Sequence, residues 1–176
     1  HNNVWGNSKY TATGIYGSGI STFENTDIDS GSGVKMIIDS NVVSKNTNTL
    51  GPFMALNPDG SGIILDDLRH SESDSNAYKG TTLIQNNIVF NNGGRGIDIY
   101  SSDHAIVLNN TAYHNNQDPI EGSWHPSEIM VNASGDAVLW NNLVSGDGGG
   151  APGNPHYGIS VEKGSGDPVR IDYEIL

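Results

Sequence analysis

A short tag recurs along this 176-residue chain, and the repeat constrains the fold more than any other feature. The tag is an Asn-Asn or Ser-Asn pair followed by two residues that are small or apolar. It occurs at positions 2–5, 40–43, 86–89, 109–112 and 141–144. Self-similarity of this kind is typical of architectures that stack one supersecondary unit on itself. We therefore expect a solenoid.

Two further strings keep step with the tag. A Gly/Glu-Ile string precedes it, and its isoleucine recurs at positions 20, 63, 97, 129 and 159. An apolar string lies directly before the tag, as at 36–38 and 106–108. Each unit therefore consists of three short strands separated by turns, with Val and Ile at buried strand positions. We expect one all-β domain over residues 1–176, built as a parallel solenoid of about five coils.

Composition excludes several classes of function. The chain has 20 acidic and 8 basic residues and a formal charge of −12, which argues against nucleic-acid binding. It has no cysteine, and so no disulfide framework or thiolate metal site. No hydrophobic run is long enough to span a bilayer, so no membrane partner is expected. A surface this acidic repels anionic polymers unless a cation bridges the two.

The same residues carry a resemblance to a known group of proteins. The three-strand coil, the Asn-Asn turn and the stretches 59–67 and 94–104 resemble the right-handed parallel β-helix of the pectate-lyase-like superfamily. That group includes polysaccharide lyases, alginate epimerases and some glycoside hydrolases. The resemblance covers nearly the whole chain and implies a secreted, carbohydrate-active protein with a polysaccharide substrate. Known epimerases carry an Asp-Pro-His-Glu string, whereas residues 125–128 here read His-Pro-Ser-Glu, which argues against epimerase activity.

This fold explains the tag. Successive coils lie ~4.8 Å apart, so an asparagine at the same turn of each coil can donate its amide to one neighbour and accept from the other. Asparagine also tolerates the left-handed backbone conformation that a tight turn requires. Either asparagine of each pair can be the stacked one. The sequence predicts an asparagine ladder through Asn3, Asn41, Asn87, Asn110 and Asn142.

Alternation along the first strand predicts a stripe of acidic residues. If the recurrent isoleucines point inward, Asp66, Asp98 and Glu128 point outward on neighbouring coils. In the resembling enzymes, this first sheet and its flanking loops form the sugar-binding groove. The resemblance therefore implies substrate-binding roles for residues on or beside this sheet, which are Tyr100, Trp124, His156, Tyr157 and Lys163.

The spacing of the acids suggests metal-assisted chemistry. Ca²⁺ takes several oxygen ligands, which Asp66, Asp67 and Asp98 can provide, and it would offset the negative surface for a uronate substrate. The leading prediction is a polysaccharide lyase that cleaves an acidic glycan by β-elimination. Its expected catalytic residues are Arg95, Asp98, His125 and Glu128, and the base is one of Arg95, Lys163, Lys79, His104 and His125.

Two alternatives stay open. A glycoside hydrolase would use two carboxylates, and Asp66 with Glu128 would lie near the upper limit of the separation expected for an inverting enzyme. A non-catalytic chain would be an extracellular glycan-binding or self-stacking β-helix. No capping helix is recognisable at either end, which predicts either a segment of a longer β-helix or end-to-end self-association.

Overall fold

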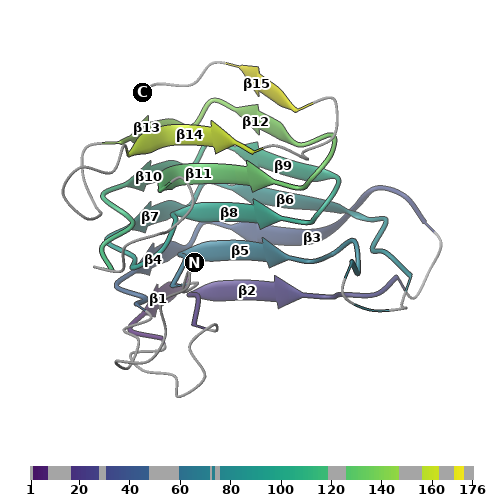
Figure 1. Ribbon diagram of the computed structural model, residues 1–176, viewed down its shortest axis with the longest axis horizontal. Coiled ribbons are helices and arrows are strands. Elements are labelled where there is room, and N and C mark those ends of the chain that lie inside the picture. Colours follow the sequence, from purple (N-terminus) through teal and green to yellow (C-terminus); the bar gives the residue numbers. More distant parts are fainter. Residues whose placement is uncertain are drawn as a thin grey trace.

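Three parallel sheets form the described part of this computed structural model, which comprises residues 2–7, 17–27, 31–47, 60–71, 73, 76–118, 126–146, 156–162 and 169–172. The chain visits the three sheets in turn as it winds from β1 at one end to β15 at the other (Figure 1). Each sheet has five strands, which confirms the predicted five coils of three short strands. No helix in the described ranges is long and apolar enough to cross a membrane.

The strands are short, and each sheet takes one strand from every coil. Sheet A contains β1 (Asn3–Trp5), β4 (Val42–Ser44), β7 (Ile88–Phe90), β10 (Thr111–Tyr113) and β13 (Leu143–Ser145). Sheet B contains β2 (Ile20–Phe23), β5 (Ile63–Asp66), β8 (Ile97–Tyr100), β11 (Ser127–Asn132) and β14 (Tyr157–Val161). Sheet C contains β3 (Val34–Asp39), β6 (Thr81–Gln85), β9 (Ala105–Leu108), β12 (Val138–Trp140) and β15 (Arg170–Asp172).

The core is a column of inward-facing aliphatic side chains. The recurrent isoleucines of sheet B lie in register, with Ile63 beside Ile97 and Ile97 beside Ile129. These three side chains are fully buried. Burial of one such side chain contributes about 1.5–3 kcal/mol, so the repeat that is visible in the sequence is also the main source of stability.

An asparagine ladder runs along the turn between sheets C and A. Its members are Asn2, Asn41, Asn87, Asn110 and Asn142, joined by side-chain amide bonds of 2.9–3.1 Å. The predicted ladder is present, and in the first coil its member is Asn2, the other asparagine of the pair, and not Asn3. The reason is the register of β1, which pairs Asn3 with Val42 and so brings Asn2 level with Asn41. In the later coils the second asparagine of each pair is the stacked one, as Asn87 shows.

The first residue of each pair has a different task. Ser40, Asn86, Asn109 and Asn141 all have φ between 54° and 57°, in the left-handed region. Asparagine adopts this conformation more readily than most residues do. The tag therefore combines a residue that turns the backbone with a residue that joins the coils.

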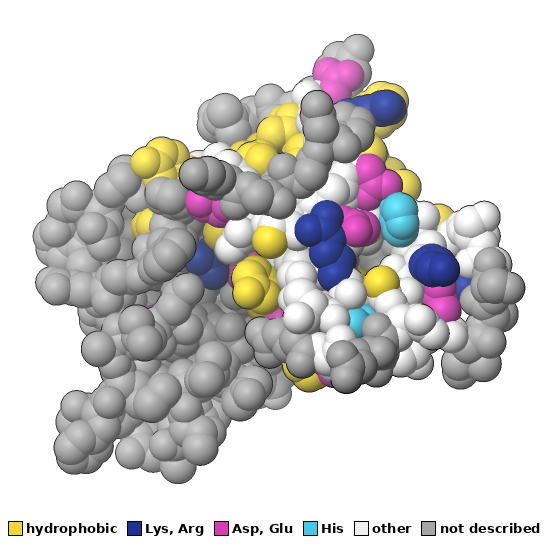
Figure 2. Space-filling model, turned by 45° about the vertical axis from the view of Figure 1, so that its right-hand side comes forward, with side chains coloured by type: hydrophobic (Ala, Val, Ile, Leu, Met, Phe, Trp, Pro, Cys, Tyr) yellow, Lys and Arg dark blue, Asp and Glu magenta, His cyan; other side chains and the backbone are white. Residues whose placement is uncertain are grey.

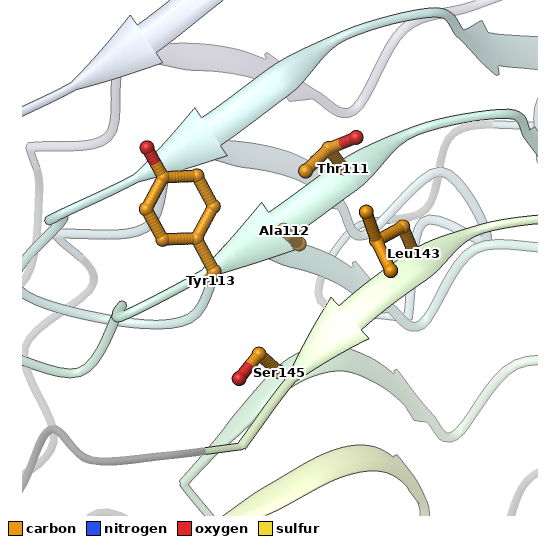
Figure 3. Close-up of a pocket in the computed structure, with 5 residues that line it drawn as sticks. All are labelled: Thr111, Ala112, Tyr113, Leu143 and Ser145. Carbon is orange, nitrogen blue, oxygen red and sulfur yellow. The ribbon is translucent and has the colours of Figure 1, made fainter. Parts of the chain in front are cut away.

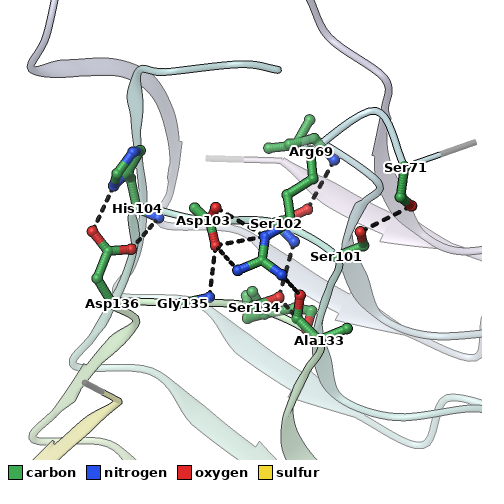
Figure 4. A network of polar contacts seen from close by, with 12 residues as sticks. Arg69, Ser71, Ser101, Ser102, Asp103, His104, Ala133, Ser134, Gly135 and Asp136 are labelled. Carbon is green, nitrogen blue, oxygen red and sulfur yellow. Dashed lines mark hydrogen bonds and ion pairs between the residues drawn. The ribbon is translucent and has the colours of Figure 1, made fainter. Parts of the chain in front are cut away.

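The turns between sheets B and C carry ion pairs that also join successive coils (Figure 4). Arg69 Nε donates to both carboxylate oxygens of Asp103 at 2.9 Å, and Arg69 Nη1 donates to the carbonyl of Ala133. His104 Nδ1 lies 2.5 Å from Asp136 Oδ2. On the side of the molecule that Figure 2 presents, basic, acidic and histidine side chains accordingly lie side by side. These pairs are partly exposed, so each is expected to contribute little to stability.

The backbone of these turns repeats, whereas the residues repeat only in part. Asp67, Ser101 and Ala133 have φ of 46–50° at the first turn position. Three positions later, His70, His104 and Asp136 have φ of 49–58°. Matching backbone conformations therefore stack on one another with side chains that are only partly alike, as His70 and His104 are.

Candidate functional site

Sheet B presents two rows of side chains on its outer face. One row places Asp98 between Ile64 and Met130, and the other places Tyr100 between Asp66 and Asn132. Asp66 and Asp98 therefore share this face but belong to different rows. The predicted stripe of Asp66, Asp98 and Glu128 is not formed, because Asp66 and Asp98 lie in different rows and Glu128 is fully buried.

Arg95 and Asp98 form a buried ion pair on this face. Arg95 follows the turn after β7, and its Nη1 donates to Asp98 Oδ2 at 3.1 Å. The exposed fractions of the two residues are 8% and 3%. Asp98 Oδ1 is also buried and has no hydrogen-bond partner within the described residues. One oxygen of the carboxylate is thus held by arginine, and the other is left for a further group.

Burial governs the ionisation of Asp98. It raises the pKa of the carboxyl group above its ordinary value, because the charged form loses its hydration. Arg95 acts in the opposite direction, and the charge of Glu162 adds a smaller upward effect. A carboxyl group with a raised pKa and a cationic neighbour is typical of residues that exchange protons in active sites.

Glu128 lies inside the solenoid and not on the outer face. Its Oε1 accepts from the backbone N–H of Asn115 at 3.1 Å, and its Oε2 accepts from the side-chain amide of Asn115. The residue is fully buried. The prediction of an outward Glu128 assumed that strand alternation extends through this position, but Glu128 is level with Gly96, where the backbone turns and a side chain points inward.

Glu128 ends a second amide ladder, which sequence reasoning missed. Asn46 donates to Asn92 and Asn92 donates to Asn115 through side-chain amides at 2.9 and 2.8 Å, and Asn115 then donates to Glu128. A Cβ on Gly96 would lie 2.7 Å from Asn115 Nδ2. This position beside the ladder therefore requires glycine. The signal was present, because an asparagine follows five residues after Asn41, Asn87 and Asn110.

His156 and Tyr157 do not join the Arg95–Asp98 pair. His156 Nε2 lies 3.5 Å from Glu128 Oε1 and 2.9 Å from Asn116 Nδ2, in a nearly buried setting. Tyr157 is in register with Ser127 and is 40% exposed. Of the predicted substrate-binding residues that the structure describes, Tyr100 is the one on the same face and strand as Asp98.

The predicted calcium ligands do not converge. Asp67 Oδ1 accepts from the backbone N–H and the hydroxyl of Ser71, at 2.9 and 2.5 Å, within its own turn. Asp66 is level with Tyr100, whereas Asp98 is level with Ile64. No group of three histidine or acidic side chains that could hold a metal ion occurs in the described ranges. These residues therefore do not fit the predicted Ca²⁺ site.

Three predicted site residues lie outside the described residues. They are Trp124, His125 and Lys163. Their predicted roles in catalysis and substrate binding remain predictions from the sequence.

Comparisons with known proteins bear on the fold. No family model matches the chain, and no curated protein is similar in sequence. Among solved structures, the chain is similar to the periplasmic alginate epimerase AlgG, with a TM-score of 0.57 and 16% sequence identity. This chain is a right-handed parallel β-helix. The match covers 99% of the β-helix and 38% of the epimerase chain, and at this identity it establishes the fold alone.

Proposed function

We propose that this β-helix acts on an acidic polysaccharide and that Arg95 and Asp98 are the centre of its chemistry. The observation that carries the proposal is the buried Asp98 carboxylate, with one oxygen on Arg95 and the other unpartnered among the described residues. The similarity to an alginate epimerase supports a carbohydrate substrate. The periplasmic location of that enzyme supports a role outside the cytoplasm.

Arg95 would recognise the carboxylate of a uronate residue. A guanidinium group is planar and always charged, and it presents paired N–H donors that match a carboxylate. In a chain with a formal charge of −12, a buried arginine gives an acidic glycan a specific point of attraction. Arg95 would also neutralise the uronate charge, which makes the proton on C5 easier to remove.

Asp98 would be the base. A uronate carboxylate bound to Arg95 brings a second negative charge close to Asp98, and a nearby like charge favours proton uptake. Asp98 would take the C5 proton, the electrons of the C5–H bond would form the C4–C5 double bond, and the C4–oxygen bond would break. The departing oxygen would take a proton from water. We therefore favour a lyase, and no step in this scheme requires a metal ion.

Burial of the pair favours one alternative. Arg95 and Asp98 are both more than nine-tenths buried, as expected for an ion pair that only stabilises the structure. In that case the chain would be a non-catalytic, glycan-binding β-helix. The predicted hydrolase has less support, because Glu128 is inside the column and does not face Asp66.

Ultraviolet absorbance near 235 nm tests the proposal. The full chain is incubated with a panel of polyuronates, and the unsaturated product is measured over time. We expect product from at least one polymer and a loss of about 100-fold or more for Asp98→Asn. Arg95→Lys keeps the charge but not the paired donors, and is expected to raise KM more than it lowers kcat. Asp39→Asn, on sheet C, is the matched control.

Proton exchange in D₂O separates the outcomes. Deuterium at C5 without a double bond would indicate epimerisation. If the wild-type chain forms no unsaturated product and does not exchange this proton, the result would support the non-catalytic alternative. Activity that survives Asp98→Asn would overturn the assignment of the base.

A further inference from the structure

The outer face of sheet A carries an aromatic stack that stops partway along the sheet. Phe90 and Tyr113 occupy matching positions in β7 and β10, and their rings are parallel within 3°, with centroids 5.2 Å apart. The matching residue in the next strand, β13, is Ser145. Phe90 therefore covers one face of the Tyr113 ring, while among the described residues the short Ser145 side chain leaves the other face uncovered.

The end of the stack is a cavity. It has a volume of about 330 Å³ and is lined by Thr111, Ala112, Tyr113, Leu143 and Ser145. This volume lies within the range of small-molecule sites. Figure 3 shows the Tyr113 ring directed away from Ser145, with Thr111 and Leu143 along the other side of the space. The walls thus combine an aromatic ring and an aliphatic side chain with two hydroxyl groups.

The charge of this face restricts what can bind. The inward positions of the five strands are Val4, Val43, Val89, Ala112 and Val144. The remaining strand positions, which face outward, hold only aromatic, aliphatic, Asn, Ser and Thr residues. An uncharged face on a chain with a formal charge of −12 suits a neutral ligand with an apolar surface.

The size of the face argues against a second copy of the chain. Five strands at ~4.8 Å spacing and three residues of ~3.3 Å each span roughly 24 by 10 Å. A stable protein interface needs about 800 Å² from each partner, several times this area. The face therefore suits a slender ligand better than a folded protein.

We propose that this cavity binds a neutral hexopyranose unit of a glycan. The C–H face of the sugar would lie on the uncovered face of Tyr113, as apolar surfaces do on aromatic rings, with Leu143 beside it. The hydroxyl groups of Thr111 and Ser145 would bond the sugar hydroxyls. This subsite lies on a different sheet from Asp98 and does not depend on the chemistry proposed there.

Isothermal titration calorimetry of the full chain with cellohexaose, maltohexaose and mannohexaose tests the subsite. We expect at least one neutral hexaose to bind, and Tyr113→Ala to weaken that binding at least about tenfold. Trp140→Ala, which removes a similarly exposed aromatic side chain from sheet C, should leave it unchanged. Asp98→Asn should also leave it unchanged, which separates this subsite from the proposed catalytic centre.

A second variant, Ser145→Phe, fills the cavity and distinguishes loss of binding from loss of folding. In Ser145→Phe, the new ring should stack on Tyr113 as Tyr113 stacks on Phe90, because the register is the same. We expect this variant to lose binding while its melting temperature stays equal or rises. Binding of none of the three hexaoses to the wild-type chain, or binding that survives Ser145→Phe, would overturn the proposal.

Discussion

Glu128 accepts hydrogen bonds from both the backbone N–H and the side-chain amide of Asn115. A carboxylate accepts but does not donate, so this contact closes the inner ladder that begins with Asn46. One coil earlier, the position that matches Glu128 is Gly96, and the ladder continues beside it. Glu128 is thus a structural residue of the column, next to the buried His156.

Removal of this acceptor should destabilise the fold. Glu128→Ala leaves two buried donors of Asn115 unpaired, which should lower the free energy of unfolding by about 2–5 kcal/mol. Glu128→Gln retains one acceptor oxygen and should cost less. Urea unfolding followed by circular dichroism measures both. Equal stability of Glu128→Ala and the wild-type chain would contradict the ladder contact.

The pH dependence of stability should reveal the buried Asp98. The pKa of Asp98 is raised in the folded state, mainly by burial, so the folded state holds this proton more tightly than the unfolded state does. The stabilising effect of the protonated Asp98 is full below the pKa of the unfolded state, about 3.9, and is lost as the pH rises through the pKa of the folded state. Relative to the wild-type chain, Asp98→Asn should therefore gain stability as the pH rises above about 4.

Asp39→Asn is a comparison variant, because the pKa of Asp39 is shifted in the opposite direction to that of Asp98. The pKa of Asp39 is lowered, chiefly by the hydrogen bond from Asn86. The stabilising effect of the Asp39 carboxylate is therefore present above the unfolded pKa and lost as the pH falls. Between pH 4 and pH 8, Asp98→Asn should gain stability relative to the wild-type chain, whereas the difference between Asp39→Asn and the wild-type chain should stay constant and change only as the pH falls below about 4. No gain for Asp98→Asn between pH 4 and pH 8 would refute the assignment for Asp98.

The two asparagines of each tag should respond differently to substitution. Asn87→Ala removes a buried ladder member and leaves its neighbours without partners, so it should cost about 2–4 kcal/mol. Asn86 has φ of 56° and is exposed, and Asn86→Gly should change stability by less than about 1 kcal/mol. Thermal unfolding of the two variants side by side compares them. A larger loss for Asn86→Gly would contradict this division of tasks.

The isoleucine column should show the graded response of a close-packed core. Ile97→Val should cost about 0.5–1.5 kcal/mol and Ile97→Ala about 2–5 kcal/mol, since Ile97 is fully buried between Ile63 and Ile129. Denaturant unfolding gives both values. A loss below 1 kcal/mol for Ile97→Ala would be incompatible with this packing.

Chelation should leave any lyase activity intact. Asp66, Asp67 and Asp98 do not converge, and the proposed chemistry uses Arg95 in place of a cation. We expect equal rates of absorbance increase with and without EDTA, which binds divalent cations. Activity that is lost with EDTA and restored by added Ca²⁺ would instead support the metal-assisted scheme.

The coils could be predicted from the sequence because their signals repeat. Ile63, Ile97 and Ile129 mark the register, and each tag marks a turn that needs a left-handed residue. Which asparagine of a pair is stacked could not be predicted where one repeat departs from the rest. In the first coil the Asn-Asn pair is offset by one residue from the later pairs, and only the pairing of Asn3 with Val42 reveals this.

The site was harder to predict, because strand alternation does not hold at every position of a short strand. Strand alternation placed Asp98 on the outer face of sheet B but misplaced Glu128, which lies in β11 directly before the inward Ile129 and is itself fully buried. The partnership of Arg95 with Asp98 was also missed. Arg95 reaches Asp98 from the turn three residues earlier, and the spacing alone did not indicate this contact.

The turns between sheets B and C hold the same backbone with side chains that repeat only in part, from Asp67 to His70, from Ser101 to His104 and from Ala133 to Asp136. Histidine recurs at 70 and 104 and serine at 102 and 134, whereas the other positions differ. Conformation and chemistry are therefore only loosely coupled at these corners. Evolution or a protein engineer could rewrite the surface there, coil by coil, while the scaffold underneath keeps its shape.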